Sequence, residues 1–191
     1  MASSAVDQAD SLSTLFGEVL ALRRPASVAV LGVAGGNGLE HIDPACTRRV
    51  VGVDLNPDYL FAVRTRFAHL PSLELYAADL STDRLSIAPV ALVHAALIFE
   101  HAGSARCLEN ALALLEPRGA LSVVLQIPGA STSHVGNSGI ASVNKLATHF
   151  SLVDPDELST RISVLGLDLI YQTRRSVPAG KQLWMGVFAR C

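Results

Sequence analysis

Residues 28–43 read VAVLGVAGGNGLEHID, and residues 50–60 read VVGVDLNPDYL. In each stretch a short apolar run, of the kind that forms a buried parallel strand, is followed by turn residues and then by a helical pattern. The first turn is rich in glycine, and the second apolar run ends in an acid, Asp54. Parallel sheets bind ligands where the C-terminal ends of their strands meet the loops that follow. Both turns are therefore candidates for one binding site.

The same alternation continues along the chain and predicts an α/β fold with mostly parallel strands joined by helices. Strands are expected at 28–32, 50–53, 72–76, 90–95 and 120–127. Helices are expected at about 9–24, from 38 to 44, from about 57 to 69, at 104–115 and after Asp154. The strand-like runs 167–177 and 181–190 are close enough to pair as an antiparallel hairpin. We expect one domain spanning residues 1–191.

Composition limits the classes of function. Half of the 191 residues are hydrophobic and 17% are charged, which is typical of a compact globular chain. A formal net charge of −2 gives no reason to expect a nucleic-acid or acidic-membrane partner. The longest apolar run, 87–99, is shorter than the roughly 20 residues that span a bilayer. The N-terminus lacks the pattern of a secretory signal, and the three cysteines show no paired spacing. We expect a cytoplasmic protein without a metal site.

The glycine-rich turn and the acid together describe a pocket for a nucleoside. Gly35, Gly36 and Gly38 let the main chain turn sharply and approach a ligand closely. Asp54 is suitably placed to accept hydrogen bonds from two neighbouring sugar hydroxyls. Each feature alone has a structural alternative, because glycine serves many tight turns and an acid often caps a helix. A dinucleotide fingerprint would need a third glycine where His41 stands, so a nicotinamide-dependent oxidoreductase is disfavoured.

Five motifs, taken in order, resemble those of the class I S-adenosylmethionine-dependent methyltransferases. They are VLGVAGGNG (30–38), VVGVDLNPDYL (50–60), YAADL (76–80), ALVHAALIFEH (91–101) and LEPRGALSVVLQ (115–126). The resemblance runs from about Ala26 to the C-terminus. It implies a Rossmann-like, doubly wound sheet of seven strands in the order 3-2-1-4-5-7-6, with strand 7 antiparallel and helices on both faces. It also implies S-adenosyl-L-methionine as the cofactor.

The resemblance assigns cofactor contacts residue by residue. Asp54 would hold the ribose, and Asp79 would face the adenine amino group while a neighbouring backbone amide meets the ring. The expected cofactor-binding residues are Ala34, Gly35, Gly36, Gly38, Asp54, Leu55, Ala78, Asp79, Leu80 and Ala95.

Two positions depart from the first motif of the family. Gly32 stands where an acid commonly orients the methionine amino group, and Ala34 stands for the first glycine. Glu40 or Glu100 is available to supply the missing charge. These departures keep open a second hypothesis, a cofactor-binding or regulatory protein on the same fold that does not catalyse transfer.

Candidates for the reacting centre lie at the end of the fourth strand and just after it. His94, Glu100 and His101 are expected to border it, with a core histidine as the alternative for His94. His134 lies in a Gly/Ser-rich loop, where a solvated histidine is the simpler interpretation. The histidines and cysteines show no ligand spacing, so no metal site is predicted.

The acceptor is expected to be a small molecule. The N/D-P-P-Y/F motif of nucleic-acid amino methyltransferases is absent after the fourth strand, where HAALIF stands, and no catalytic Pro-Cys pair occurs. With no basic patch either, nucleic acid is disfavoured. Cover for the substrate would come from the N-terminal helix, from the loop at about 128–150, or from a second subunit in a homodimer.

Overall fold

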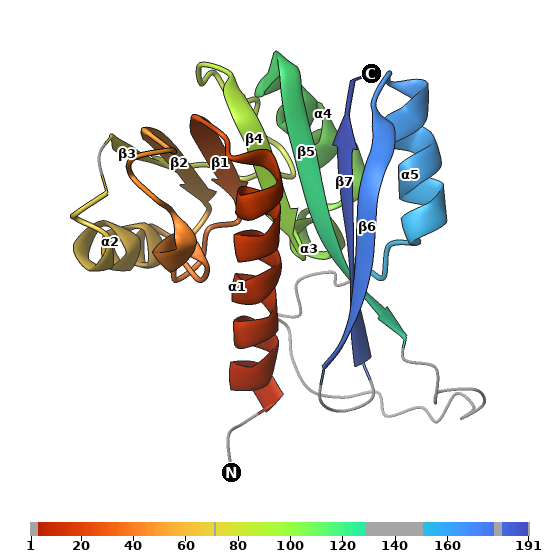
Figure 1. Cartoon of the computed structure of the whole chain (residues 1–191), viewed down its shortest axis with the longest axis horizontal. Helices are drawn as coiled ribbons and strands as arrows, with labels where there is room; N and C mark the ends of the chain where they lie inside the picture. Colours follow the sequence, from red (N-terminus) through yellow and green to blue (C-terminus); the bar gives the residue numbers. More distant parts are fainter. Residues whose placement is uncertain (1–3, 71, 129–150, 178–180, 191) are drawn as a thin grey trace.

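The computed structural model describes residues 4–70, 72–128, 151–177 and 181–190, with side chains from residue 7 onward. Seven strands form one sheet in the order β3-β2-β1-β4-β5-β7-β6 (Figure 1). β7 pairs antiparallel with both β5 and β6, and the other neighbours pair in parallel. The strands are β1 Ser27–Leu31, β2 Arg49–Asp54, β3 Leu73–Ala77, β4 Val90–Ala96, β5 Leu115–Pro128, β6 Asp168–Val177 and β7 Lys181–Ala189. The predicted fold class, strand order and hairpin are confirmed.

Helices cover both faces of the sheet. They are α1 Ser4–Arg23, the 3-10 helix η1 Leu39–His41, α2 Pro57–Arg66, α3 Ile98–Ala102, α4 Ser104–Ala113 and α5 Pro155–Val164. Apolar side chains of α1, η1 and α2 share one core with one face of the sheet, and those of α3, α4 and α5 share a second core with the other face. Figure 1 shows α1 in front of the sheet and α4 behind it. Both faces of the central strands are therefore buried, which explains their continuous apolar sequences.

Two predicted helix starts are confirmed by their caps. The Asn56 side chain accepts a hydrogen bond from the amide of Asp58 at 2.9 Å. The Asp154 carboxylate accepts from the amides of Asp156 and Glu157 at 2.7 and 3.1 Å. In both helices proline occupies the first helical turn, where its missing N–H costs nothing.

Other boundaries differ from the prediction. The helix expected from Gly38 to Pro44 is a single 3-10 turn. Asp43 precedes Pro44 and is therefore disfavoured in helical conformation, and Ile42 is already extended. The helix expected at 104–115 ends at Ala113, since Leu115 pairs with Val90 and begins β5. The short helix α3 was not predicted.

The predicted substrate-cover loop begins at Pro128, the last residue of β5, and its residues 129–150, with His134, lie outside the described part. Among the described helices, none combines the length and the apolar character needed to cross a membrane.

Candidate functional site

The turn after β1 is tied to the end of β2 by main-chain hydrogen bonds. The amides of Gly32 and Val33 both donate to the carbonyl of Val53, at 2.8 and 3.0 Å. The amide of Ala34 donates to Oδ2 of Asp54 at 2.8 Å. Ala34 has a φ of 43°, a left-handed conformation that is uncommon outside glycine. The two turns singled out in the sequence therefore form one hydrogen-bonded unit.

The glycines of this turn serve different purposes. A Cβ atom on Gly36 would lie 2.7 Å from the ring of Phe67, and one on Gly38 would lie 2.7 Å from the ring of Phe16. Both glycines thus allow close packing within the protein. A Cβ atom on Gly35 would meet no atom of the described residues within 4 Å, and Ala34 is exposed. Ala34–Gly35 is therefore a part of the loop that is open to a ligand.

Asp54 is held in place through both carboxylate oxygens. Oδ1 accepts from the amide of Asn56 at 2.9 Å, while Oδ2 accepts from Ala34. A carboxylate oxygen has two lone-pair sites, so one acceptor position on each oxygen is left for a ligand. The next residue, Leu55, exposes 66% of its surface at the same sheet edge. A fixed acceptor pair therefore lies beside an exposed apolar side chain.

The turn after β3 adjoins this pair. The amide of Ala78 donates to the carbonyl of Asp54 at 3.1 Å. The Asp79 carboxylate accepts from the hydroxyl and the amide of Ser81, and these bonds lower the pKa of Asp79. Leu80 is only 4% exposed, so its side chain belongs to the core and only its main chain is available to a ligand. A hollow of about 370 Å³ lies beside this turn, lined by 76–78 and 83–87.

The edge formed by β1 and β4 is apolar. Gly32 has a φ of 72°, and a Cβ atom there would lie 2.9 Å from Cδ1 of Ile98. Ile98 is the first residue of α3 and is half-buried. The space that a larger side chain at position 32 would enter is therefore filled by Ile98. Sequence reasoning missed Ile98, because nothing in an isolated isoleucine after a strand indicates which turn it will contact.

His94 and Ala95 lie inside the sheet. The His94 ring is 3% exposed, stacks on the ring of Phe16 with centroids 4.6 Å apart, and has Nδ1 3.1 Å from the hydroxyl of Ser122. Burial lowers the pKa of His94 to about 3. Ala95 is fully buried in the opposite core. Burial favours the alternative interpretation of His94 as a core histidine. The cofactor contact expected of Ala95 stays a prediction, and its buried side chain leaves only the main chain to make it.

Glu100 is a buried carboxyl. It is 1% exposed, its Oε1 accepts from the amide of Gln126 at 2.8 Å, and its Oε2 has no hydrogen-bond partner among the described residues. Burial raises the pKa of Glu100. The carbonyl of Glu100 also accepts from the amide of Ser151 at 3.0 Å. Glu100 therefore joins α3 to the residues on either side of 127–150, and its carboxyl is inaccessible to a substrate. His101 is exposed on the same helix, and its catalytic role stays a prediction.

Polar contacts join α1 to the turn after β1, residues 32–38, which we call the glycine loop. The Ser13 hydroxyl donates to Oε1 of Glu40 at 2.6 Å and lies 2.9 Å from Nε2 of His41. Oε2 of Glu40 accepts from the amide of Gly38 at 3.0 Å and lies 3.7 Å from Arg66. Burial raises the pKa of Glu40. Hydrogen bonds from Ser13 and the main chain, together with the charge of Arg66, lower this pKa by a larger amount, so the net shift is downward.

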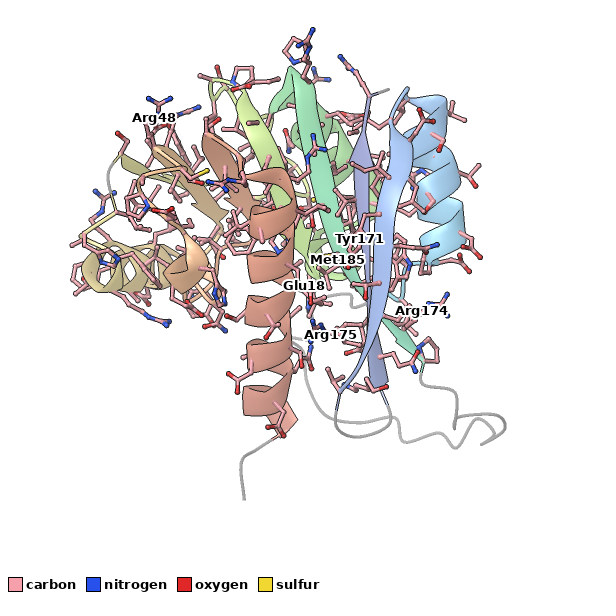
Figure 2. All side chains as sticks on the ribbon, viewed as in Figure 1. Glu18, Arg48, Tyr171, Arg174, Arg175 and Met185 are labelled. Carbon is pink, nitrogen blue, oxygen red and sulfur yellow. The ribbon has the colours of Figure 1, made fainter. Side chains whose placement is uncertain are left out.

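The other side of α1 is anchored to β6. Glu18 and Arg175 form an ion pair, and Figure 2 shows the two side chains meeting between these elements. An open hollow of about 640 Å³ lies between α1 and residues 41–47. Neither residues 32–38 nor Asp54 line this hollow. It is therefore separate from the candidate site at the C-terminal ends of β1 and β2. Among the described residues, no group of three His, Cys, Asp or Glu side chains is arranged to hold a metal ion.

Neither a protein-family model nor a curated protein sequence matches this chain. Solved structures do match it over almost its whole length. The N-methyltransferase NodS from Bradyrhizobium japonicum WM9 is 14% identical, with 94% of each chain covered and a TM-score of 0.70. The glycopeptide N-methyltransferase MtfA is 18% identical, with 95% of this chain and 96% of MtfA covered and a TM-score of 0.66.

The CcbJ methyltransferase from Streptomyces caelestis is 19% identical, with 97% of this chain and 90% of CcbJ covered and a TM-score of 0.66. NodS and MtfA have also been solved in complex with S-adenosyl-L-homocysteine. The chain has the class I methyltransferase fold. At these identities the likeness concerns the fold, and the function has to be argued from the site.

Proposed function

We propose that the chain is an S-adenosylmethionine-dependent methyltransferase that acts on a small-molecule acceptor. The observation that carries this proposal is the Asp54 carboxylate, fixed through both oxygens at the C-terminal edge of β2 beside the open main chain of Ala34–Gly35. On this fold, that edge is where nucleoside ligands bind.

The residues present fit the adenosine part of the cofactor. Asp54 would accept hydrogen bonds from the two ribose hydroxyls, and the exposed side chain of Leu55 would pack against the base. The amide of Leu80 makes no hydrogen bond with the described residues, so it is available as a donor to the ring beside Asp79. The cofactor itself supplies an activated methyl group. The protein then needs chiefly to position an acceptor in line and to exclude water.

The structural neighbours support a small-molecule acceptor. NodS and MtfA are both described as N-methyltransferases, and MtfA acts on a glycopeptide. An amine is therefore the first class of acceptor to assay. Of the side chains predicted to border the reacting centre, the exposed His101 is the one we retain as a candidate.

Calorimetric titration with S-adenosyl-L-homocysteine tests the proposal directly. We expect saturable binding to the native chain and about a 100-fold loss of affinity in Asp54→Ala, because two hydrogen bonds to a charged group each contribute about 1.5 kcal/mol or more. Asp58→Ala is the matched control, since Asp58 is an exposed acid four residues further along. Absence of binding to the native chain, or equal binding to Asp54→Ala, would reject the proposal.

A turnover assay separates the proposal from the non-catalytic alternative. Release of S-adenosylhomocysteine in the presence of an acceptor would establish transfer. Tight cofactor binding without turnover over a broad panel of amines, hydroxyls and thiols would instead fit a binding or regulatory protein.

A further inference from the structure

The order of the strands determines which part of a bound nucleoside meets which turn. With its base at the end of β3 and its ribose on Asp54 at the end of β2, a nucleoside directs its 5′ substituent toward β1 and β4, the next two strands in the sheet. Neighbouring strands are about 4.8 Å apart, so a substituent longer than a methyl group reaches the β1–β4 edge. That edge is where Gly32 contacts Ile98.

The 5′ substituent of S-adenosylhomocysteine carries an ammonium group, and a carboxylate is the partner that gives it the strongest, charge-assisted hydrogen bond. All 17 Asp and Glu residues of the chain lie within the described residues. Three of them contact the glycine loop or stand on α3 beside Ile98, namely Glu40, Asp54 and Glu100.

None of these three carboxylates is directed at the β1–β4 edge. Glu40 faces α1 and α2, because Ser13 and the amide of Gly38 donate to its oxygens and Arg66 lies 3.7 Å away. Asp54 serves the ribose in the proposed function. Glu100 is 1% exposed and directs Oε1 at Gln126 on β5. The side chain that fills the position next to Gly32 is Ile98, which has no charge.

We propose, on the basis of the proposed function, that this site holds its cofactor through the adenosine half and offers no carboxylate to the ammonium group of the tail, and that Ile98 sets this specificity. The site then binds 5′-thioadenosines that lack an aminoacyl tail about as tightly as those that carry one. Its ligand class extends from S-adenosylhomocysteine to tail-free thioethers of adenosine.

Calorimetry on the full chain with two ligands tests the inference. S-adenosylhomocysteine and 5′-methylthioadenosine share the nucleoside and the thioether sulfur, and they differ only in the tail. We expect the two dissociation constants to agree within about fivefold, since a charge-assisted hydrogen bond would contribute tenfold or more. A larger preference for S-adenosylhomocysteine overturns the inference while leaving the proposed function intact. Failure of both ligands to bind overturns the proposed function and the inference together.

A pair of variants tests the part assigned to Ile98. Ile98→Asp introduces a carboxylate at the first position of α3, where an acid is favourable to the helix. We expect it to raise the affinity for S-adenosylhomocysteine about tenfold and to leave 5′-methylthioadenosine unchanged. Ile98→Asn introduces a side chain of nearly the same shape as aspartate but without the charge. It should leave the dissociation constants of both ligands unchanged. Equal behaviour of the two folded variants rejects the role of Ile98, and the two-ligand comparison on the native chain requires no variant to fold.

Discussion

The two halves of the candidate site are built from different chemistry. At the ends of β2 and β3 the side chains are polar and fixed, with Asp54 bonded through both oxygens and Asp79 bonded to Ser81. At the ends of β1 and β4 the ionisable side chains His94 and Glu100 are buried, and Ile98 fills the space beside Gly32. The comparison shows that a strand-end site on this fold can place its fixed charges on one side only.

The glycine loop lies between the two halves and belongs to both. Its outer part, Ala34–Gly35, is open toward a ligand, while Gly36 and Gly38 pack on aromatic rings of the protein. The same loop is therefore a ligand surface at one end and a core element at the other. This division can be tested by the free energy of unfolding of variants at its two ends.

The largest expected effect separates Gly36 from Gly35. Gly36 has a φ of 77°, and a Cβ atom there would lie 2.7 Å from the Phe67 ring. We expect Gly36→Ala to lower the free energy of unfolding by about 3 kcal/mol, the sum of left-handed strain and overpacking. Gly35→Ala, in open space, should change it by about 0.5 kcal/mol or less. Urea denaturation of both variants measures the difference, and equal losses would show that the loop is not divided in this way.

The next effect concerns the charge state of His94. Its pKa in the folded protein is lowered to about 3 by burial, so the unfolded chain binds a proton that the folded chain does not as pH falls below about 6.5. Stability should therefore be lost on acidification, by about 2 kcal/mol between pH 7.5 and 5. His94→Gln can keep the bond to Ser122 and should lack this loss. Glu100 titrates in the opposite sense in both proteins, so the difference between them isolates His94.

The result for His94 also bears on its role. If His94 instead faced an open reaction chamber, its ring would bind a proton about equally well in the folded and unfolded states. The stability of the native protein and of His94→Gln would then depend on pH in the same way. Parallel stability curves for the two proteins would therefore restore His94 as a candidate for contact with a substrate.

The polar half of the site could be predicted from the sequence because local rules govern it. Asp54 ends an apolar run and is followed by Asn56 and a proline. The strand, the helix cap and the turn therefore determine its position. The position of Asp54 thus depends on residues a few positions apart. The strand order is of a different kind, since it was implied by the resemblance of the five motifs to the methyltransferase family.

The apolar half could not be predicted in the same way because it depends on contacts between distant residues. The stacking of His94 on Phe16 joins positions 78 residues apart in the chain (94 minus 16). The contact of Ile98 with Gly32 depends on α3, a five-residue helix with no sequence signal of its own. His94 was expected to border the reacting centre because it lies at the end of a strand, and Glu100 because it follows that strand, yet burial is decided by what packs above them.

A smaller effect is expected at Glu100. Glu100→Gln preserves the acceptor for the amide of Gln126 and places an amide group where Oε2 has no partner within the described part of the chain. At pH 5 we expect a loss of about 1 kcal/mol, the cost of one unmet polar group. Since burial raises the pKa of Glu100, its contribution to stability is present below the unfolded value of the pKa and is lost as pH rises toward the folded value. The gap between the variant and the native protein should therefore narrow from pH 5 to pH 8, and a gap that widens would contradict a buried neutral carboxyl.

The smallest effect tests how the outer part of the loop is supported. Arg66 donates to the carbonyl of Gly35 at 3.3 Å, and its guanidinium lies 4.8 Å from the centre of the Phe67 ring. Because the Arg66 side chain is about half exposed, we expect Arg66→Ala to lower the free energy of unfolding by only about 0.5 kcal/mol. Arg64→Ala, two residues earlier on α2, is the matched control. If both variants unfold at the same urea concentration, Arg66 adds nothing measurable to the loop, and the hydrogen bonds to Val53 and Asp54 are sufficient to hold Ala34–Gly35 in place.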